Sequence, residues 1–451
     1  MISVQNASRT LHTLLGAQTV DETATYRRIT FCIVTEADGA RIAYNMFTGE
    51  IAELTAEEAD ALQQETVTVN DVTRPLIAGW FLVPVEHDDI RLVDEMRDLL
   101  VLFEKNKGIS QYTIFTTMDC NARCFYCFEL GKPRTPMSMA TAKETAAFIE
   151  RTRNKEKPVK ITWFGGEPLC NPEIMDCISA ELAAMGVDFY CSMISNGFLF
   201  NEALVEKAVR DWKMQWIQIT LDGTRDVYNQ IKAYVDCEGK DAFAIVTDNI
   251  ELLMQHGIDV RVRMNMGMHN KEDLYALADF LAKRYGGNKL LSAYTKLLFE
   301  DDLQTPEMQM LLAEDLLQFE RYCTSLGLTY PRTAAKEMHL RRCMADSDSA
   351  IVVTPTGHLG KCEHFSDSEH VGTVRDGITD PAKVAEFKTR VNNKALCAGC
   401  PVYPNCVRLP KCSVYGKAHC YPASRVIEKA HAETAAQNTY RKWKEEKKKA
   451  E

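Results

Sequence analysis

The segment between residues 111 and 300 alternates short apolar runs with longer helical patterns. Such alternation is typical of βαβ units, which build a parallel sheet covered by helices. The predicted strands span residues 112–117, 159–164, 187–194, 215–221, 259–266 and 289–299. The helices predicted between them span residues 140–150, 172–184, 202–210, 242–255 and 271–283. Six such units fit a partial (β/α) barrel, whose ligand sites lie beyond the carboxyl ends of its strands.

Polar, glycine-containing loops follow the first four predicted strands. A cysteine-rich loop follows the first strand, and Gly165-Gly166-Glu167-Pro168 follows the second. Ser195-Asn196-Gly197 follows the third strand, and Asp222-Gly223 follows the fourth. Because the carboxyl ends of barrel strands meet on one rim, these four loops predict a single ligand site.

The loop after the first predicted strand contains Cys120, Cys124 and Cys127 in a C-x3-C-x2-C spacing. Three thiolates on a four-iron cluster leave one iron without a protein ligand. The alternative is a zinc knuckle or a redox pair. Such sites usually take their ligands as C-x2-C pairs, with a matching pair further along the chain. The spacing therefore favours an iron–sulfur cluster with an open iron.

This cysteine run, with Gly165-Gly166-Glu167 following it, resembles the signature of radical S-adenosylmethionine (SAM) enzymes. The resemblance implies that Cys120, Cys124 and Cys127 are the catalytic cluster ligands. It also implies that the open iron chelates the amino and carboxylate groups of SAM. Reductive cleavage of SAM would then give a 5'-deoxyadenosyl radical that abstracts a substrate hydrogen.

The same resemblance assigns SAM contacts to the rim loops. It places Tyr126 against the adenine, and Gly165, Gly166 and Glu167 at the amino group. Ser195 and Asn196 occupy the position that contacts the carboxylate or ribose, and Asp222 begins a loop with polar contacts to the same ligand. The alternatives are an aromatic side chain that packs over the cluster, and ordinary turns, which favour the same residue types.

Arg263 and Asn265 lie on the fifth predicted strand with alternate-residue spacing. Side chains two residues apart on a strand point to the same face, so both are expected inside the barrel. A buried charge needs a partner, and the SAM carboxylate would be one for Arg263.

Cysteines become frequent again in the last hundred residues, where the later group reads C-x2-C-x5-C-x5-C-x7-C. With a G-x4-C spacing from Gly357, this region resembles the SPASM domain of radical SAM peptide-modifying enzymes, which holds two auxiliary clusters. Two features depart from that pattern: x5 replaces the usual x3 before the fourth late cysteine, and no second cysteine closely follows Cys343. Zinc is the competing interpretation for the late group.

The resemblance distributes the carboxy-terminal cysteines over two clusters. The second auxiliary cluster would take Cys397, Cys400, Cys406 and Cys420, and the first would take Cys343, Cys362 and Cys412. Three ligands leave one iron open, and such a site favours a thiolate, here a substrate cysteine. Cys323 is a less favoured fourth ligand. The remaining cysteines are mostly expected to be buried small hydrophobic residues.

The first hundred residues contain strand-like runs at 29–34, 40–46 and 79–83 and helical patterns at 55–64 and 88–105. Thr55 and Glu58 have the spacing of a capping box. The region looks similar to the winged-helix-like peptide-recognition domain that precedes the barrel in many ribosomal-peptide maturases; the alternative is a structural cap. The predicted division is a recognition domain (1–105), a partial barrel (106–302), a helical bridge (303–340) and a SPASM domain (341–451).

Composition narrows the functional class. The 451-residue chain has a formal charge of −10, which argues against a broad nucleic-acid surface. It has no apolar run of membrane-spanning length and no recognisable export signal, so a cytoplasmic location is expected. Sixteen cysteines in such a reducing compartment are available to metals.

Together these features predict a radical SAM/SPASM maturase that installs a thioether in a cysteine-containing ribosomal peptide with a leader. The expected cofactors are SAM and three 4Fe-4S clusters, and the expected electron donor is of flavodoxin or ferredoxin type. The alternatives are a carbon–carbon or ether crosslinking maturase, a formylglycine-generating sulfatase maturase, and a non-catalytic iron–sulfur scaffold or electron carrier. Residues 300–302 are a candidate base cluster, although a solvated acidic loop is the simpler interpretation.

Overall fold

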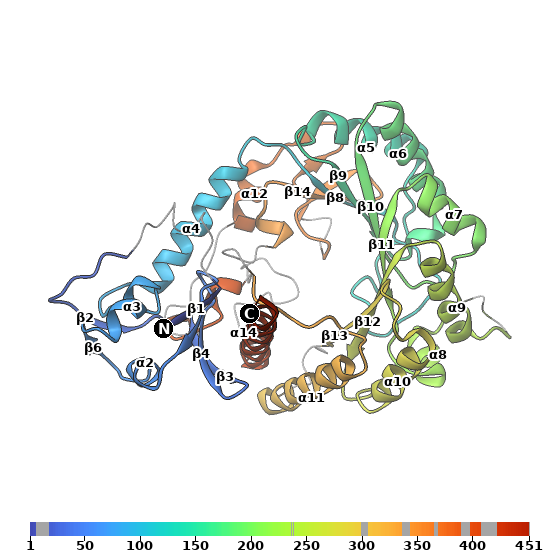
Figure 1. Cartoon of the computed structure of the whole chain (residues 1–451). Helices are drawn as coiled ribbons and strands as arrows, with labels where there is room; N and C mark the ends of the chain where they lie inside the picture. The colour runs from blue at the N-terminus through green and yellow to red at the C-terminus, as the bar shows by residue number, and fades with distance from the viewer. Residues whose placement is uncertain are drawn as a thin grey trace.

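A computed structural model of the chain describes residues 1–5, 18–235, 237, 239–298, 305–335, 343–364, 369–388, 397–406 and 422–450. In this part of the chain, the strands form a ten-stranded sheet, a four-stranded sheet and a three-stranded sheet (Figure 1). The large sheet lies beside the amino-terminal region that holds the two small ones. The candidate base cluster at 300–302 lies outside the described residues.

Six parallel strands form the predicted partial barrel and neighbour one another in chain order. They are β8 (Gln111–Thr117), β9 (Val159–Gly165), β10 (Phe189–Ser195), β11 (Met214–Thr220), β12 (Asp259–Met266) and β13 (Leu291–Leu297). The helices that accompany them are α5 (Met139–Thr152), α6 (Pro172–Ala184), α7 (Glu202–Arg210), α8 (Arg225–Lys232), α9 (Ala242–Gln255) and α10 (Asp273–Tyr285). All six predicted strands and five of these helices are confirmed. The prediction missed α8, a helix of eight residues.

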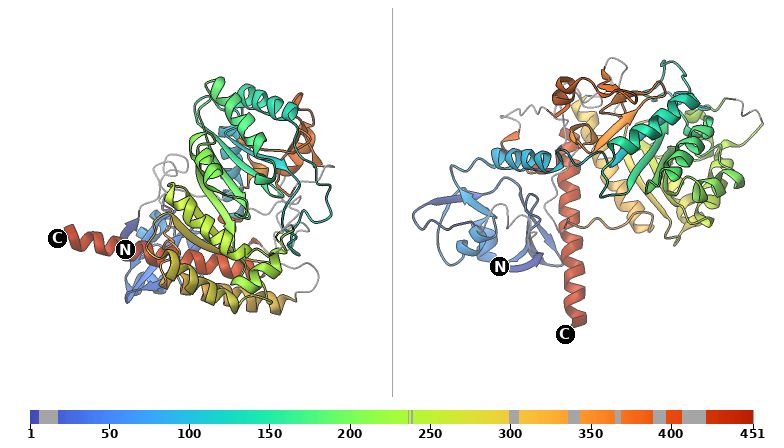
Figure 2. Two further views of the ribbon diagram at one scale, coloured as in Figure 1. Left: turned by 90° about the vertical axis from the view of Figure 1, so that its right-hand side faces the viewer. Right: turned by 90° about the horizontal axis from the view of Figure 1, so that it is seen from above.

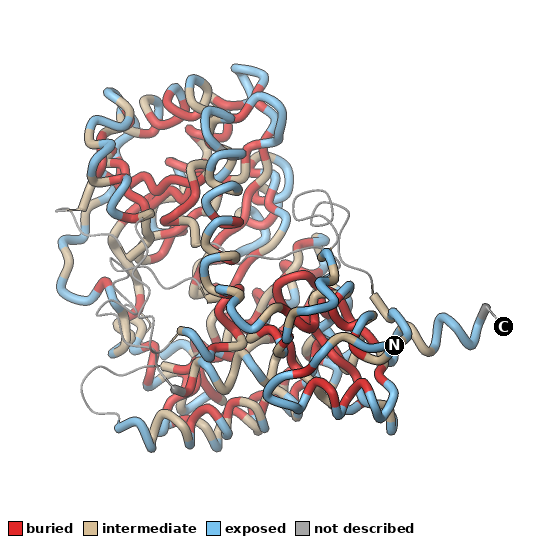
Figure 3. The backbone as a smooth tube through the Cα atoms, turned by 90° about the vertical axis from the view of Figure 1, so that its left-hand side faces the viewer, coloured by how far each residue is buried: buried red, intermediate tan, exposed pale blue. Residues whose placement is uncertain are grey.

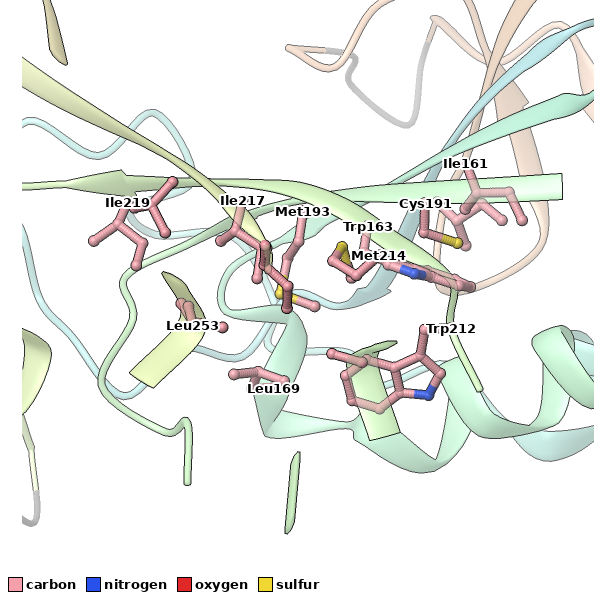
Figure 4. Packing of buried hydrophobic residues seen from close by; sticks show 14 of the residues in the cluster. Ile161, Trp163, Leu169, Cys191, Met193, Trp212, Met214, Ile217, Ile219 and Leu253 are labelled. Atoms are coloured by element: carbon pink, nitrogen blue, oxygen red, sulfur yellow. The ribbon is translucent and has the colours of Figure 1, made fainter. Parts of the chain in front are cut away.

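The large sheet has an apolar face and a more polar face, because successive side chains of each strand point to opposite sides. The face that packs against the helices is apolar, and Figure 4 shows part of this core, with Ile161, Trp163, Cys191, Met193, Ile217 and Ile219 from three neighbouring strands. The intervening residues point to the opposite, concave face, because successive side chains of a strand alternate. Several of these are polar, including Thr162, whose hydroxyl lies 3.0 Å from that of Ser192.

The sheet continues past the predicted end of the barrel. Strand β14 (Ala350–Val353) pairs in parallel with β8, with Val352 opposite Thr113. Antiparallel pairing then adds β15 (His358–Gly360), β16 (Gly372–Thr373) and β17 (Gly377–Ile378). The large sheet therefore contains strands from both sides of residue 341, where the SPASM domain was predicted to begin.

The amino-terminal region contains two antiparallel sheets. The order in the first is β1 (Ile2–Gln5), β5 (Ile51–Leu54), β4 (Ala40–Asn45) and β3 (Cys32–Ala37); in the second it is β6 (Val67–Thr68), β2 (Thr25–Arg28) and β7 (Leu82–Pro84). Helices α2 (Ala56–Ala61), α3 (Thr73–Ala78) and α4 (Asp89–Glu104) accompany them. Thr55 caps α2, and the capping box with Glu58 is confirmed. The region contains more strands than the sequence predicts, and the winged-helix-like assignment stays a prediction.

The long final helix α14 (Pro422–Ala450) packs against the amino-terminal region. Its Ala432, Ala435, Ala436 and Tyr440 belong to the same apolar core as residues of β3 and β4. Figure 2 shows α14 running between that region and the barrel, where it also lies along α11 (Pro306–Ser325). Beyond Tyr440 the helix extends outward and is largely exposed (Figure 3). The segment 341–451 is therefore divided between two cores.

Within the described residues, no helix combines the length and the apolar character needed to cross a bilayer.

Candidate functional site

The cysteine loop is fixed from two sides by backbone hydrogen bonds. On one side, Glu167 N–H donates to Asp119 O at 2.8 Å. On the other, the carbonyl of Lys232 at the end of α8 accepts from Arg123 N–H at 2.8 Å. Asn121 O also accepts from Val235 N–H at 2.8 Å. The loops after β8, β9 and β11 are therefore joined at one rim, as predicted.

The thiols of this loop lie in a setting that suits cluster ligands. Ala122 N–H donates to Cys120 Sγ at 3.3 Å, and the backbone N–H of Glu129 donates to Cys127. Burial, and then the carboxylate of Glu167, raise the pKa of Cys120 to about 12. A thiolate here therefore needs a cationic partner, and N–H donors aimed at sulfur are typical of iron–sulfur sites. The charge of Cys124 acts on both Cys120 and Cys127, so the three thiols lie near one another, as a 4Fe-4S cluster would require. Among the described residues, no three His, Cys, Asp or Glu side chains form a group that would hold a single metal ion.

Two glycines allow the loop after β9 to approach the cysteine loop. A Cβ on Gly165 would lie 2.1 Å from Thr117 O, and one on Gly166 would lie 2.3 Å from Asp119 O. Both contacts are with backbone, which has little freedom to move aside. Gly165 also has a φ of +125°, which side chains rarely adopt. Glycine is therefore required at both positions by close backbone packing.

Glu167 is fully buried and joins two of the predicted loops. Its carboxylate accepts from Ser195 Oγ at 2.9 Å and from Asn196 N–H at 2.7 Å. It also accepts from Leu169 N–H at 3.2 Å. Burial raises the pKa of Glu167 to about 7, although these hydrogen bonds and the charge of Lys232 oppose the shift. The site thus contains a buried carboxyl group whose charge changes near neutral pH.

Asn196 extends this cluster to the cysteine loop. Its Nδ2 donates to Asn121 Oδ1 at 2.7 Å and lies 3.9 Å from Cys120 Sγ. The structure therefore brings Glu167, Ser195 and Asn196 together beside the first cysteine, as their predicted common role requires.

A second buried network holds Tyr126. Its hydroxyl donates to Asp222 Oδ2 and accepts from Lys232 Nζ at 2.9 Å. Asn265 Nδ2 donates to Asp222 Oδ1 at 3.0 Å. Three residues predicted separately, Tyr126, Asp222 and Asn265, are therefore bonded to one another.

Lys232 belongs to this network and was not among the predicted site residues. Burial lowers its pKa, but the neighbouring charges, of which Asp222 is the largest, together outweigh burial and raise the pKa well above its usual value. The charge of Cys124 acts in the same direction. Lys232 therefore provides a permanent cation beside the cysteine loop. The signal in the sequence was a lysine directly after the apolar Ile231, on a short helix following a predicted site loop.

Arg263 lies on the concave face, as predicted. Its Nε donates to Asn265 Oδ1 at 2.8 Å. Its charge also acts on Glu363 and His364, which follow Cys362 in the carboxy-terminal region. The expected contact between Arg263 and SAM stays a prediction. The neighbours of Arg263 include residues of the carboxy-terminal region as well as Asn265, another predicted SAM contact.

The carboxy-terminal cysteines fall into two groups. Cys343 and Cys362 pack against the same small cluster of Ala345 and Phe387. Cys397 and Cys400 lie in the amino-terminal core, and Cys400 N–H donates to Cys397 O at 3.0 Å. Cys406 follows three residues after Tyr403 of that core. Cys412 and Cys420 lie outside the described residues.

Cys323 lies apart from both groups. It is buried in the barrel core, whereas Cys343 and Cys362 belong to another cluster, so the structure does not bring it to the first auxiliary set. Cys32, Cys177 and Cys191 are buried too, as expected of small hydrophobic residues. Cys170 is exposed and Cys237 is partly exposed.

Residues 114–281 match the model of the radical SAM superfamily. The chain is 22% identical over 277 residues to an uncharacterized protein of Methanocaldococcus jannaschii, covering 60% of this chain and 90% of that protein. It is 23% identical over 274 residues to the serine-type anaerobic sulfatase-maturating enzyme of Klebsiella aerogenes, covering 56% of this chain and 65% of the enzyme.

Three solved structures of two proteins share the fold. The enzyme anSMEcpe with bound AdoMet has a TM-score of 0.55 at 15% identity, covering 74% of this chain and 99% of its own. The same enzyme with AdoMet and a Cp18Cys peptide has a TM-score of 0.54 at 14% identity, with the same coverage. SuiB of Streptococcus suis bound to precursor peptide SuiA has a TM-score of 0.50 at 12% identity, covering 84% and 94%. Residues 114–281 therefore form a radical SAM domain, and the chain that carries it is an enzyme.

Proposed function

We propose that this enzyme cleaves SAM and modifies a ribosomally made, cysteine-containing peptide, forming a thioether between the cysteine sulfur and a carbon. The supporting observation is the meeting of three functional parts at one rim. The cysteine loop, the SAM loops and the segment after Cys362 converge there: the His364 ring lies 4.1 Å from the Phe128 ring on the cysteine loop.

The SAM contacts follow from the two buried networks. A carboxylate offers about four acceptor sites, and Glu167 uses three, which leaves capacity for the SAM amino group. Lys232 offers a fixed cation for the SAM carboxylate, and Tyr126 offers a ring for the adenine. Ser195, Asn196, Asp222 and Asn265 hold these groups in place through their own hydrogen bonds.

Cys120, Cys124 and Cys127 would hold a 4Fe-4S cluster, which would supply the electron for reductive cleavage of SAM to a 5'-deoxyadenosyl radical. The chain's own contribution is to position SAM and to exclude water around Glu167 and Asp222, both of which are fully buried. A flavodoxin- or ferredoxin-type protein would deliver the electron.

The peptide leader would bind the amino-terminal region. Strand β6 lies at one edge of its three-stranded sheet, and a groove of about 410 Å³ opens beside it. Its lining includes Glu57 and Ala61 of α2 and Val67 and Thr68 of β6. An extended peptide can add a strand at such an edge, with its side chains in the groove. The fold neighbour SuiB is solved with a precursor peptide.

The thioether depends on the auxiliary clusters. We assign Cys343, Cys362 and Cys412 to one cluster and Cys397, Cys400, Cys406 and Cys420 to another. The separate cores that hold Cys343 with Cys362, and Cys397 with Cys400, support two sites. Cys343, Cys362 and Cys412 would leave one iron of such a cluster open to the substrate thiolate. The substrate carbon would lose a hydrogen atom to the 5'-deoxyadenosyl radical, the thiol would lose a proton, and the remaining electron would go to the auxiliary cluster.

Formylglycine formation is the second candidate. It is favoured by the match to a sulfatase-maturating enzyme and by a fold likeness that covers 99% of the anSMEcpe chain. That likeness covers only 74% of the present chain. The additional residues of the present chain agree better with an enzyme that recognises its substrate through a leader peptide.

The two functions differ in the product that they leave. The test is co-expression with a short cysteine-containing peptide encoded beside the enzyme, followed by mass spectrometry. A thioether removes two hydrogens and one alkylatable thiol but keeps the sulfur, whereas formylglycine replaces the sulfur with oxygen. Retained sulfur with loss of the thiol supports our proposal. A sulfur-free aldehyde product, or an unmodified peptide with intact SAM cleavage, would refute it.

A further inference from the structure

Two cations lie near one aromatic ring on the concave face of the barrel. Arg261 Cζ lies 4.2 Å from the centroid of the Trp216 ring, and Lys160 Nζ lies 5.7 Å from it. The three side chains come from β12, β11 and β9. Val159, Ile161, Ile217, Val260 and Val262, their chain neighbours, all pack on the helix side. The three side chains therefore point away from the helices, into the barrel.

The intervening strand β10 makes this arrangement possible. Its Ser192 lies opposite Thr162 on one side and opposite Trp216 on the other. Lys160 itself lies opposite Tyr190, so its side chain reaches the Trp216 ring diagonally across β10. The indole ring thus lies near both cationic groups.

These cations lack a matching negative charge. Within the described part of the chain, the ion pairs include none for Lys160, and Arg261 reaches only Asp259 at 4.0 Å. Both side chains of that pair are close to half-exposed, so it contributes little. Burial and the charge of Arg261 lower the pKa of Lys160, as expected for two like charges held together. The chain as a whole has a formal charge of −10, so a cationic pair inside the barrel departs from its general character.

We propose that Lys160, Arg261 and Trp216 form a carboxylate-binding subsite for the peptide, a proposal that rests on the proposed function for the nature of its occupant. A carboxylate between the two cations would accept charge-assisted hydrogen bonds from both. The Trp216 ring would pack against the adjoining methylene groups. The carboxylate is either an acidic side chain or a free chain end.

The position of the subsite gives the spacing in the peptide. Lys160 lies five residues before Gly165, where the SAM loop begins. At about 3.3 Å per residue, the subsite lies about 16 Å below the rim. An extended peptide covers that distance in roughly five residues. The acidic group is therefore expected about five residues from the residue that reacts.

The test measures peptide binding by isothermal titration calorimetry, using reconstituted holoenzyme without reductant. The probe is the capped peptide Ala-Ala-Glu-Ala-Ala, compared with its Gln form capped and with its Gln form bearing a free carboxyl end. We expect the capped Glu peptide to bind at least about tenfold more tightly than the capped Gln peptide. Tight binding of the uncapped Gln peptide would identify the chain end as an equal occupant.

Variants locate the binding in the subsite. Lys160→Met and Arg261→Met are each expected to weaken Glu-peptide binding about tenfold or more. Lys143→Met removes the same charge from the exposed side of α5 and is expected to leave binding unchanged. Equal binding of the capped Glu and Gln peptides, or wild-type binding by both subsite variants, would overturn the proposal.

A charge reversal gives a second measurement that needs no peptide. Lys160→Glu places a carboxylate beside Arg261, so we expect a higher Tm and no binding of the Glu peptide. A lower Tm for this variant would contradict the claim that the subsite lacks an anion. Because none of these measurements uses SAM cleavage, failure of the proposed function would appear separately, as an unmodified peptide in the turnover assay.

Discussion

The ammonium of Lys232 lies 2.9 Å from a carboxylate oxygen of Asp222, and the two side chains are 3% and 0% exposed. This buried ion pair is also bonded to Tyr126 of the cysteine loop. It therefore connects the loop that holds the cluster cysteines to the loop after β11 and to helix α8.

Breaking this pair is expected to be costly. Lys232→Met leaves Asp222 buried without its cation, which typically costs about 3–5 kcal/mol of unfolding free energy. SAM cleavage should be lost with it, because Tyr126 loses its donor. Denaturant unfolding and 5'-deoxyadenosine production measure the two effects.

The matched control is Lys271→Met. Lys271 pairs with Asp315 at 2.6 Å, but both side chains are partly exposed, so we expect a loss of at most about 1 kcal/mol. Equal effects of the two substitutions would show that burial of the Lys232 pair has no special role.

Replacing Cys120, Cys124 and Cys127 by Ala should abolish SAM cleavage. Separate cysteines are assigned to the other two clusters, so iron should fall from about twelve to about eight atoms per chain. Iron analysis after anaerobic reconstitution, with a 5'-deoxyadenosine assay, gives both numbers. Complete loss of iron would contradict the auxiliary assignment, and unchanged SAM cleavage would contradict the site itself.

Gly166→Ala should disrupt the SAM site. The added Cβ would lie 2.3 Å from Asp119 O, so the loop after β9 must separate from the cysteine loop. We expect SAM binding measured by calorimetry to weaken by more than about tenfold. Gly257→Ala is the control, since its φ of +80° costs about 1–2 kcal/mol but its Cβ meets nothing within 4 Å. Similar SAM affinities for the two variants would exclude the close-packing explanation.

SAM affinity should depend on pH through Glu167. Burial raises its pKa to about 7, so below pH 7 the group is mostly neutral and must lose its proton to become a charged acceptor for the SAM amino group. Affinity should therefore rise about tenfold per pH unit below pH 7 and level off above it. SAM affinity measured by calorimetry at about six pH values, from about 5.5 to about 8.5, would define the curve. Glu167→Gln should bind weakly at every pH, and a wild-type slope in that variant would assign the titration to another group.

Leader recognition at the β6 edge is tested with Thr66→Pro. Proline removes the N–H of the residue directly before the edge strand, where an added peptide strand would need a donor. Processing of leader-bearing peptide should slow several-fold while SAM cleavage without peptide continues. Thr66→Val keeps the N–H and should behave as wild type; equal processing by both variants would place the leader elsewhere. Deleting residues 1–100 is a poorer test, because it would expose the apolar residues of α14 that pack there.

Local sequence determined much of the barrel. Helices α6, α7 and α9 were predicted at their observed bounds, because the spacing of their apolar residues and their Pro, Asn or Asp start signals are local. The rim loops were predictable for a related reason: parallel strands bring their carboxyl ends to one edge, so loops far apart in sequence must meet.

Tertiary structure decided the features that depend on contacts between distant segments. Nothing near Lys232 in the chain indicates that Asp222 and Tyr126 surround its ammonium. The pairing of β14 with β8 joins segments more than 200 residues apart, and α14 packs on strands at the other end of the chain. Each of these contacts is stabilised by burial or charge pairing between elements, which a pattern within one element does not encode. The sequence therefore determined the helices and strands of the barrel and the positions of its predicted site loops. The tertiary structure determined which side chains form ion pairs, which pack in one core and which strands join one sheet.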